Sequence, residues 1–434
     1  MMTAAFDTLV VGAGPAGIAA AVTAAEHGAR VGLVDDNPAA GGQIWRDGGH
    51  LPPAAKHWLA RLAALKVERL HGWRVYDSPR PSVLAAEQTG AAPAETTAQF
   101  RFNQLILATG ARERFLPFPG WTLPNVMGAG GLDAMVRGGL PIAGKRVVVA
   151  GAGPLLLAVA AHLAARGARI EAICEQAPAR QFRPLALQLL RQPAKLLQGI
   201  GYRWSTRRSP YHLHRMVTAA LGKERLQSVQ LQQGNRKWSV ECDYLACGFH
   251  LIPNTELAEL LGCRLDDGFV AVNDTLQTTV ANVWCAGEPT GIGGVELAVL
   301  EGQMAGSAAA GNLSAARAMI AQRQAAMQFV NALRKATALD PRLRELATDE
   351  TIVCRCEDVP LAVLDERKSW RDAKLHTRCG MGPCQGRICG GATEFLFGWR
   401  ADSVRAPLFP ARVRSLAEPV NERLTDSEEL KETV

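Results

Sequence analysis

The stretch Thr8-Leu-Val-Val-Gly12-Ala-Gly14-Pro-Ala-Gly17 decides the fold, because it joins an apolar, β-prone run to an alanine-rich helix through a glycine turn. A second β-prone run, Arg30 to Val34, ends in Asp35-Asp36. The first glycine permits a tight turn, the second lets a pyrophosphate reach backbone N–H groups at the helix N-terminus, and the third lets helix and strand pack closely. Asp35 follows at the spacing of a carboxylate that accepts ribose hydroxyls. The stretch therefore predicts a βαβ dinucleotide-binding unit.

A second unit of the same kind begins at Lys145. Its strand and turn read Arg146-Val-Val-Val-Ala-Gly151-Ala-Gly153-Pro-Leu-Leu156, followed by a helix to Arg166 and a strand, Arg169 to Ile173, that ends near Glu175. Leu156 replaces the third glycine and is expected to crowd the helix against its strand. Two interpretations stay open. The unit takes NAD(P)H or another adenine nucleotide, or it is a structural domain without a hydride-donor role.

Length and composition set the class of protein. A chain of 434 residues with 48% apolar residues is expected to form two or three globular domains of α/β type. The net charge of +7 is spread along the chain without long Lys/Arg runs, so no nucleic-acid partner is expected. Residues 8–25 carry no charge, but Gly12, Gly14, Pro15 and Gly17 interrupt them, so we predict neither a signal peptide nor a membrane span.

Other segments carry weaker expectations. The loop starting at Gly41-Gly42-Gln43 and ending near His50 is expected to fold back over a cofactor. A basic stretch, Arg180 to Arg208, follows the second unit. The remaining expectations are a short strand over 73–77, a solvent-exposed hairpin region over 85–97, antiparallel strands over 226–233 and 237–247, an amphipathic helix starting over 297–309, and a helical connector over 314–347.

Three motifs together resemble the glutathione-reductase-like flavoproteins, which have two dinucleotide-binding domains. They are the first glycine turn, Ala108-Thr109-Gly110 and Cys285-Ala-Gly287-Glu288, and the resemblance covers roughly the first 310 residues. It implies that the first turn holds FAD, that the Thr-Gly turn lies beneath the cofactor, and that Glu288 contacts the ribityl and pyrophosphate groups, where the wider family prefers Asp. The cysteine pair of the disulfide reductases is missing, because 41–50 contains no cysteine and Cys174, Cys242 and Cys247 form no Cys-x-x-Cys.

Half of the ten cysteines lie within 36 residues, in Cys354-Arg-Cys356-Glu and Thr377-Arg-Cys379-Gly-Met-Gly-Pro-Cys384-Gln-Gly-Arg-Ile-Cys389. Without a secretory signal these thiols are expected to be metal or cluster ligands rather than disulfides. The wording resembles the bacterioferritin-associated-ferredoxin-like [2Fe-2S] module, which implies Cys354, Cys356, Cys384 and Cys389 as ligands. Cys379 is left out because the final pair of that module matches Cys384 and Cys389. A four-thiolate zinc site is the alternative.

A flavoprotein followed by this module resembles the A or α subunits of opine oxidases for octopine and nopaline, of hydroxyproline and proline dehydrogenases, and of hydrogen cyanide synthase. The resemblance implies an electron-transfer subunit that binds FAD and a [2Fe-2S] cluster. It implies that the amine is oxidised in a partner B or β flavoprotein similar to D-amino-acid oxidase, with an external electron acceptor. Further candidates are a small third subunit, and a second adenine nucleotide or FMN near a subunit interface. The rival hypotheses are a self-contained NAD(P)H-dependent flavin reductase and a non-catalytic scaffold or redox sensor.

The expected fold class is therefore α/β, a two-dinucleotide-binding-domain flavoprotein with a small C-terminal [2Fe-2S] domain. The expected domains are 1–125 and 251–312 for FAD, 126–250 for the second unit, 313–345 for the connector and 346–434 for the cysteine domain and tail. No catalytic base is assigned, and the location is expected to be cytoplasmic, with peripheral membrane association through the complex as a further expectation. The candidate cofactor-binding residues are Gly12, Gly14, Pro15, Gly17, Asp35, Asp36, Gly42, Gln43, Val75, Thr109, Gly110, Gly287, Glu288 and Gly294.

Overall fold

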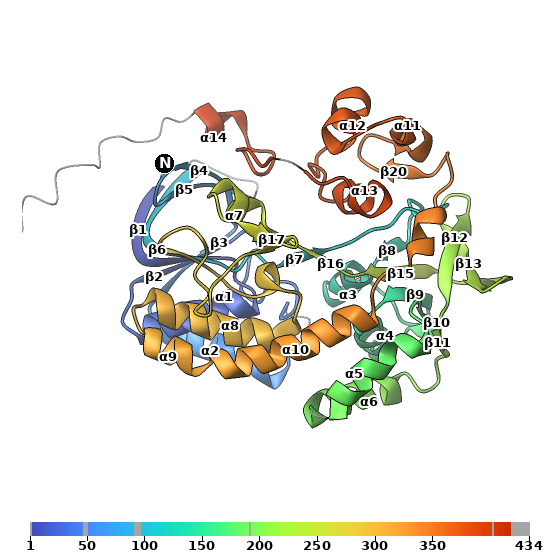
Figure 1. Ribbon diagram of the computed structural model, residues 1–434, viewed down its shortest axis with the longest axis horizontal. Helices are drawn as coiled ribbons and strands as arrows, with labels where there is room; N and C mark the ends of the chain where they lie inside the picture. Colours follow the sequence, from blue (N-terminus) through green and yellow to red (C-terminus); the bar gives the residue numbers. More distant parts are fainter. Residues whose placement is uncertain (1, 47–50, 91–96, 191, 402, 418–434) are drawn as a thin grey trace, which may run out of the picture.

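Two α/β units and a smaller cysteine-bearing domain make up the molecule (Figure 1). The structure, a computed structural model, describes residues 2–46, 51–90, 97–190, 192–401 and 403–417. Part of the predicted loop, residues 47–50, lies outside the described residues. Among the helices that the structure describes, none combines the length and apolarity needed to cross a bilayer.

The first unit is built on a seven-stranded sheet in the order β3-β2-β1-β6-β5-β4, with β19 paired to the far end of β6. Strands β1, β2, β3, β6 and β19 are parallel, which brings their carboxyl ends to one edge. The strands are β1 (Met2–Val11), β2 (Val31–Asp35), β3 (Val67–His71), β4 (Trp73–Arg80), β5 (Val83–Gln88), β6 (Thr97–Leu107) and β19 (Val283–Cys285).

Helices α1 (Pro15–Glu26) and α8 (Gly294–Ala309) pack against each other, while α2 (Pro53–Ala64) contacts α1 from another side. Small residues permit the close approach of α1 and α8. A Cβ atom on Gly302 or Gly306 would collide with the backbone carbonyls of Ala16 or Ala20 in α1. The alanine-rich sequence of α1 is therefore a packing requirement, since this helix lies buried between the sheet and α8.

The second unit is a five-stranded parallel sheet in the order β11-β10-β9-β15-β8. A separate antiparallel sheet, β12-β13-β14, lies beside it. The elements are β8 (Val126–Gly128), α3 (Ala129–Arg137), β9 (Arg146–Ala152), α4 (Leu155–Ala165), β10 (Arg169–Glu175), η1 (Ala179–Phe182), α5 (Arg183–Leu190), α6 (Pro193–Ser205), β11 (Tyr211–Leu213), β12 (Met216–Gly222), β13 (Leu226–Gln233), β14 (Arg236–Glu241) and β15 (Tyr244–Phe249).

Short ribbons and helices link these units to the cysteine domain. In Figure 1, α10 runs from the first unit toward the second. The elements are β7 (Ala111–Glu113), β16 (Leu251–Pro253), α7 (Glu256–Leu260), β17 (Leu265–Asp266), β18 (Phe269–Val270), η2 (Glu288–Thr290), α9 (Leu313–Ala318), α10 (Ile320–Ala336), η3 (Pro341–Glu345), β20 (Ile352–Cys354), β21 (Val359–Pro360), α11 (Leu361–Asp365), α12 (Trp370–Thr377), α13 (Cys389–Phe397) and α14 (Val413–Ala417).

Two local expectations were wrong. The expected strand over 237–247 is two strands, β14 in the antiparallel sheet and β15 in the parallel sheet beside β9. The expected exposed hairpin over 85–97 instead begins within the buried strand β5, although residues 91–96 lie outside the described part. Its small residues are buried because the C-terminal tail crosses here: Ser415 Oγ donates to Glu87 Oε2 (2.8 Å), and Tyr76 Oη donates to the Ser415 carbonyl (2.9 Å).

Candidate cofactor and cysteine sites

The three glycines of the first turn serve three different steric needs. Gly12 has a φ of +103°, and a Cβ there would collide with the Ala108 carbonyl. A Cβ on Gly17 would collide with the carbonyl of Gly12. Among the described residues, and apart from its own chain neighbours, Gly14 has no atom within 4 Å of a Cβ placed there, so it faces open space. The turn is thus tight where helix and strands meet, and open at the N-terminus of α1, where amides attract an anion.

Of the acidic pair that ends β2, only one carboxylate belongs to the turn. Asp35 is buried, and it accepts hydrogen bonds from the Ala13 backbone N–H and from the backbone and side-chain N–H groups of Asn37 (both 2.7 Å). Asp36 points toward solvent and pairs with Arg74 (3.3 Å). The structure therefore places Asp35 against the loop, and Asp36 outside it.

Of three further candidate cofactor-binding residues in the first unit, only one lies next to the glycine turn. A Cβ on Gly42 would lie 2.8 Å from Gly14 Cα, so the 41–46 loop does fold back onto the glycine turn, next to Pro15. Gln43 is exposed. The Val75 side chain is buried in a hydrophobic core of the first unit. Gly42 thus lies next to the turn, whereas the Gln43 side chain faces solvent and that of Val75 packs in the core.

The Thr109-Gly110 turn is locked to Asn254, a residue that sequence reasoning did not select. Thr109 Oγ1 donates to the Asn254 carbonyl (2.6 Å), and Asn254 Nδ2 donates back to the Thr109 carbonyl (2.9 Å). Arg112 completes the cluster through Asn254 Oδ1 (2.8 Å). This arrangement holds the first turn after β6 against the chain that returns from the second unit.

The two carboxylate oxygens of Glu288 have different surroundings. Its Oε1 accepts from the Gly294 N–H (3.0 Å) at the start of α8, while its buried Oε2 has no hydrogen-bond partner among the described residues. Burial raises the Glu288 pKa to about 7, and the nearby Glu301 adds to this. An unpaired buried carboxylate oxygen is costly unless a donor reaches it. The backbone N–H groups beside Gly14 can donate to a diphosphate, and Glu288 Oε2 can accept from a hydroxyl group. Together these groups fit a ligand such as FAD.

Glu301 is the second functional residue that sequence reasoning missed. It is fully buried and accepts from the Gly287 N–H (2.9 Å), from Thr290 Oγ1 (2.6 Å) and from Arg323 Nε (2.7 Å). It therefore fixes the turn that presents Glu288. The available signal was a lone acidic residue on an otherwise apolar helix face.

The second glycine turn follows a similar sequence pattern but differs in backbone and surroundings, since Gly153 has a φ of +92° where Gly14 has −76°. Gly151 has a φ of +141°, and a Cβ there would collide with the Gly248 carbonyl. Leu156, in place of the third glycine, is fully buried and fits against Gly248, which has no side chain. Glu175 accepts from the Gly153 (2.7 Å) and Ala177 (2.9 Å) N–H groups, and burial raises its pKa to about 7. The crowding expected from Leu156 is therefore relieved by the opposing glycine.

Residues 337–340, named here the strap, close this second turn. The side chain of Gln176, 1% exposed, donates to the Ala338 carbonyl (3.0 Å) and accepts from the Asp340 N–H (2.7 Å). Thr337 lies 3.8 Å from a Cβ built on Gly153, the position that is open in the first turn. His250 Nε2 hydrogen-bonds the Thr337 carbonyl (2.6 Å). The chain itself thus covers the place where a nucleotide would approach.

The five clustered cysteines come together in the C-terminal domain. The Sγ atoms of Cys354, Cys379 and Cys389 are buried and lie within 4.8 Å of one another. The exposed Cys356 lies beside Cys384, whose thiol and backbone N–H face it. The four predicted ligands therefore form two pairs, Cys354 with Cys389 and Cys356 with Cys384, and Cys379 joins the first pair.

The thiol arrangement fits soft-metal chemistry. A [2Fe-2S] cluster takes two thiolates on each iron, and two pairs of thiols are the number that such a cluster would need. The backbone N–H groups of Gly380 and Glu357 face the Cys354 sulfur, as amides around a cluster do. A four-thiolate zinc site would draw on the same groups.

The cysteine loop packs directly on the ribbon that follows Thr109-Gly110. Arg112 Nε in β7 donates to the Arg387 carbonyl (3.3 Å), and Arg114 Nη1 donates to the Gly391 carbonyl (3.1 Å). A Cβ on Gly391 would collide with Ile252 of β16, the strand paired with β7. Two to four residues therefore separate the Thr-Gly turn from side chains that hold the loop of Cys384 and Cys389.

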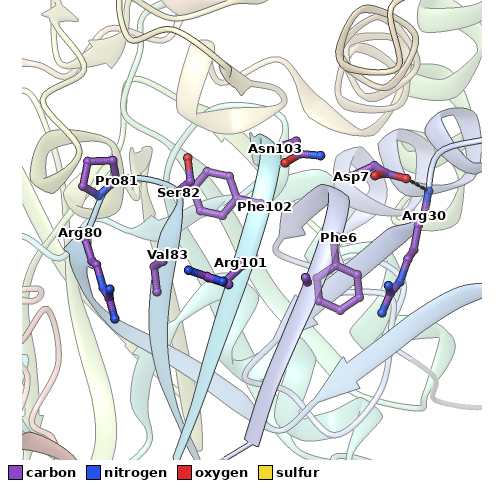
Figure 2. A pocket seen from close by; sticks show the side chains of 11 residues that line it. Phe6, Asp7, Arg30, Arg80, Pro81, Ser82, Val83, Arg101, Phe102 and Asn103 are labelled. Atoms are coloured by element: carbon purple, nitrogen blue, oxygen red, sulfur yellow. Dashed lines mark hydrogen bonds between the residues drawn. The ribbon is translucent and has the colours of Figure 1, made fainter. Parts of the chain in front are cut away.

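A separate cavity of about 530 Å³ lies elsewhere on the first unit (Figure 2). It is bordered by Phe6, Arg30, Arg80, Arg101 and Asn103, and by neighbouring residues of β1, β6 and the β4–β5 turn. Phe6 in β1, and Arg101 and Asn103 in β6, precede Gly12 and Ala108 by several residues along their strands, so the cavity lies away from the carboxyl edge that carries the glycine turn. It is not the cofactor site.

Comparison with known proteins agrees with this architecture. The profile of the pyridine nucleotide-disulphide oxidoreductase family matches residues 6–325. The A subunit of opine oxidase from Agrobacterium tumefaciens (strain Ach5) is 32% identical over 96% of this chain and 90% of its own length. The HcnB subunit of hydrogen cyanide synthase from Pseudomonas protegens is 32% identical over 89% of this chain and 90% of its own. The structure of L-proline dehydrogenase from P. horikoshii shares the fold, with a TM-score of 0.68, 17% identity, and coverage of 96% of this chain and 80% of its own.

Proposed function

The chain belongs to the pyridine nucleotide-disulphide oxidoreductase family, and from this premise we propose that it is the FAD- and [2Fe-2S]-containing electron-transfer subunit of a heteromeric oxidase. Its relatives over nearly the whole length are subunits of opine oxidase and hydrogen cyanide synthase. The proposed substrate class is therefore an amino acid or secondary amine, such as an opine or hydroxyproline. It is oxidised in a partner flavoprotein, and this chain passes the electrons to an external acceptor.

The junction between the cysteine loop and β7 is the observation that carries this proposal. Arg112 and Arg114 lie two and four residues after Gly110, and they bond the backbone carbonyls of Arg387 in the cysteine loop and of Gly391 in the first turn of α13. Arg112 also pairs with Glu256 (2.9 Å), so the two sites are joined by a short, partly buried and ion-paired bridge. A bridge of this kind keeps a fixed, short separation between two redox groups.

The residues that would hold each group follow from their geometry. The Gly12–Gly17 turn would bind the FAD diphosphate at the N-terminus of α1, and Glu288 Oε2 would accept from a cofactor hydroxyl. Cys354, Cys356, Cys384 and Cys389 would hold the cluster. A flavin exchanges one or two electrons and a [2Fe-2S] cluster exchanges one, which suits a neighbouring pair. Arg112, Arg114 and Glu256 would maintain their separation.

An absorption spectrum of the purified chain, with iron, sulfide and zinc measured on the same sample, is the first test. We expect flavin bands, a broad red shoulder and about two irons per chain. Zinc without iron would contradict the electron-transfer assignment, while the flavoprotein assignment would remain. A chain that purifies without flavin under conditions that preserve the complex would contradict both.

Single cysteine variants test the ligand set. Cys384→Ser is expected to remove iron and abolish dye-linked turnover of the complex while FAD stays bound. Cys379→Ser is the matched control. It alters a fully buried cysteine among the five that lie together, but one that is not a predicted ligand, so the variant is expected to retain iron. Loss of iron in Cys379→Ser, with iron retained in Cys356→Ser, would reassign the site to the buried thiols.

The rival function, a self-contained NAD(P)H-dependent flavin reductase, is tested by mixing the chain with NADH or NADPH in a stopped-flow instrument. The strap lies where a hydride donor would approach Gly153, so we expect the flavin to stay oxidised. Rapid bleaching by either nucleotide would favour the reductase and reject the strap as a barrier.

A further inference from the structure

The basic stretch of the second unit has no role in the proposed function. Between Gln176 and Lys223 the sequence has seven arginines and two lysines but no acidic residue. The stretch includes α5 and α6, which Figure 1 places in green at the lower edge of the second unit, far from the cysteine domain. Such a run of one charge sign on a packed helical hairpin calls for an acidic counterpart.

Helix α6 presents an apolar stripe on its free face. Leu197, Ile200 and Trp204 are 67%, 53% and 67% exposed, and they recur at the i, i+3 and i+7 spacing of one helix face. The opposite side is the packed one: Tyr202 contacts His162 of α4 edge-to-face, and Thr206 is buried. The exposed stripe is therefore not the side by which α6 packs on the protein, because the opposite side of the helix makes those contacts.

Cations flank the end of this stripe. The Arg207 guanidinium lies 5.0 Å from the centre of the Trp204 ring, and both Arg207 and the adjacent Arg208 are exposed. At the other end, Lys195 pairs with Glu296 of α8 (2.7 Å), which fixes the helix to the first unit. A tryptophan and aliphatic side chains bordered by arginines are typical of helices that lie in the interface of an anionic bilayer.

We propose that the α6 face formed by Leu197, Ile200 and Trp204, together with Arg207 and Arg208 in the turn after the helix, is a docking surface for an anionic lipid membrane. The apolar side chains would enter the headgroup region while the arginines contact lipid phosphates. A second copy of the chain is disfavoured as occupant, because both copies would bring the same positive charge. A protein partner is disfavoured, because three apolar side chains fall short of the roughly 800 Å² per partner that stable interfaces bury.

Co-sedimentation of the purified full chain with lipid vesicles tests the surface. We expect binding to equal mixtures of phosphatidylcholine and phosphatidylglycerol, weakened by high salt, and little binding to phosphatidylcholine alone. The double variant Arg207→Gln with Arg208→Gln should weaken binding about 25-fold, since each basic residue near an anionic surface contributes about fivefold. Trp204→Ser should weaken it by about tenfold or more.

Matched controls alter the same residue types elsewhere. Arg236→Gln in β14 and Leu375→Ser, 68% exposed on α12, should leave vesicle binding unchanged. Equal binding to neutral vesicles, or α6 variants that bind like the parent chain, would overturn the proposal. So would an α6 variant that retains vesicle binding while it alters the mass of the oligomer or the recovery of a partner protein. Flavin and iron contents play no part in this readout, so it stands or falls apart from the proposed function.

Discussion

The two glycine turns of this chain share a Gly-x-Gly sequence pattern but differ in backbone, because Gly14 has a φ of −76° and Gly153 a φ of +92°, and they differ in what lies above them. In the part of the chain that the structure describes, Gly14 of the first turn faces open space, and a buried carboxylate oxygen of Glu288, on the segment that returns from the second unit, has no hydrogen-bond partner. In the second, the equivalent Gly153 faces Thr337, and Gln176 beside it is hydrogen-bonded to the strap. A fold that repeats within one chain therefore has an open turn in one unit and a covered turn in the other.

The acids that end the second strand of each unit show the same contrast. Asp35 and Glu175 both accept a backbone N–H from their own glycine turn. Burial raises the Glu175 pKa to about 7, and Tyr211 and Gln176 lie around it in place of solvent. The second carboxylate has become an internal brace of its turn, which suits a domain retained for structure.

The largest expected effect is the loss of flavin when the open turn is filled. Gly14 has extended backbone angles and free space for a side chain, so Gly14→Val should fold while its methyl groups occupy the diphosphate cradle. We expect at least a hundredfold loss of FAD affinity, because such a cradle needs close approach to backbone N–H groups. The flavin-to-protein absorbance ratio after gel filtration measures it.

Gly90→Val is the matched control for that variant. Among the described residues, Gly90 also has no neighbour within 4 Å of a built Cβ, but it follows β5 rather than lying beside α1. It should retain full flavin. If Gly14→Val also retains full flavin, the first turn is not the FAD site and the contrast between the two turns loses its functional meaning.

The next effect concerns Leu156, which replaces a glycine in the second turn. If the leucine had only replaced the glycine without packing against anything, shortening its side chain would hardly change the free energy of unfolding. It is fully buried against Gly248 and the helix core, so Leu156→Ala should lower the free energy of unfolding by about 2–5 kcal/mol. Chemical denaturation measures the loss, with the exposed Leu313→Ala in α9 as control. A loss below that of the control would mean that the second unit does not depend on this packing.

Glu175 gives the comparison a pH dependence. Its folded pKa of about 7 exceeds the ordinary value of 4.5, so the folded state holds an extra proton between these limits and its stability falls as pH rises from about 4.5 to 7. The cost, fully present above pH 7, is up to about 3 kcal/mol. Glu175→Gln should reduce this slope by its own share, as measured by denaturation at pH 5 and pH 8, while Glu288, whose pKa burial also raises to about 7, keeps its contribution. The same slope in the variant would assign the pH dependence to another group.

The sequence alone predicted the parts of the molecule that depend on residues close together in the chain. Both βαβ units, the Thr-Gly turn and the cysteine cluster follow from local patterns, since glycine spacing and strand periodicity are properties of neighbouring residues. The strap, Asn254, Glu301 and the tail over β5 did not follow from them. Each acts through a partner more than ten positions distant, as when Gln176 binds Ala338 across 162 residues. Such contacts leave no periodic signal in a single sequence.

The smallest expected effect tests the strap itself. Gln176→Ala leaves the Ala338 carbonyl and the Asp340 N–H without their buried partner, which should cost about 1–3 kcal/mol and lower the melting temperature by several degrees. Gln232→Ala, whose amide bonds a carbonyl in an exposed hairpin, is the control and should change stability by less than about 0.5 kcal/mol.

The informative measurement is the binding of ADP to both variants by calorimetry. Binding that appears only in Gln176→Ala would show that the second turn keeps a nucleotide-competent shape beneath the strap. Its absence would mean that the turn has lost that shape and that the strap covers a purely structural unit. Binding already present in the parent chain would contradict the strap as a barrier, and with it the contrast between an open and a closed turn.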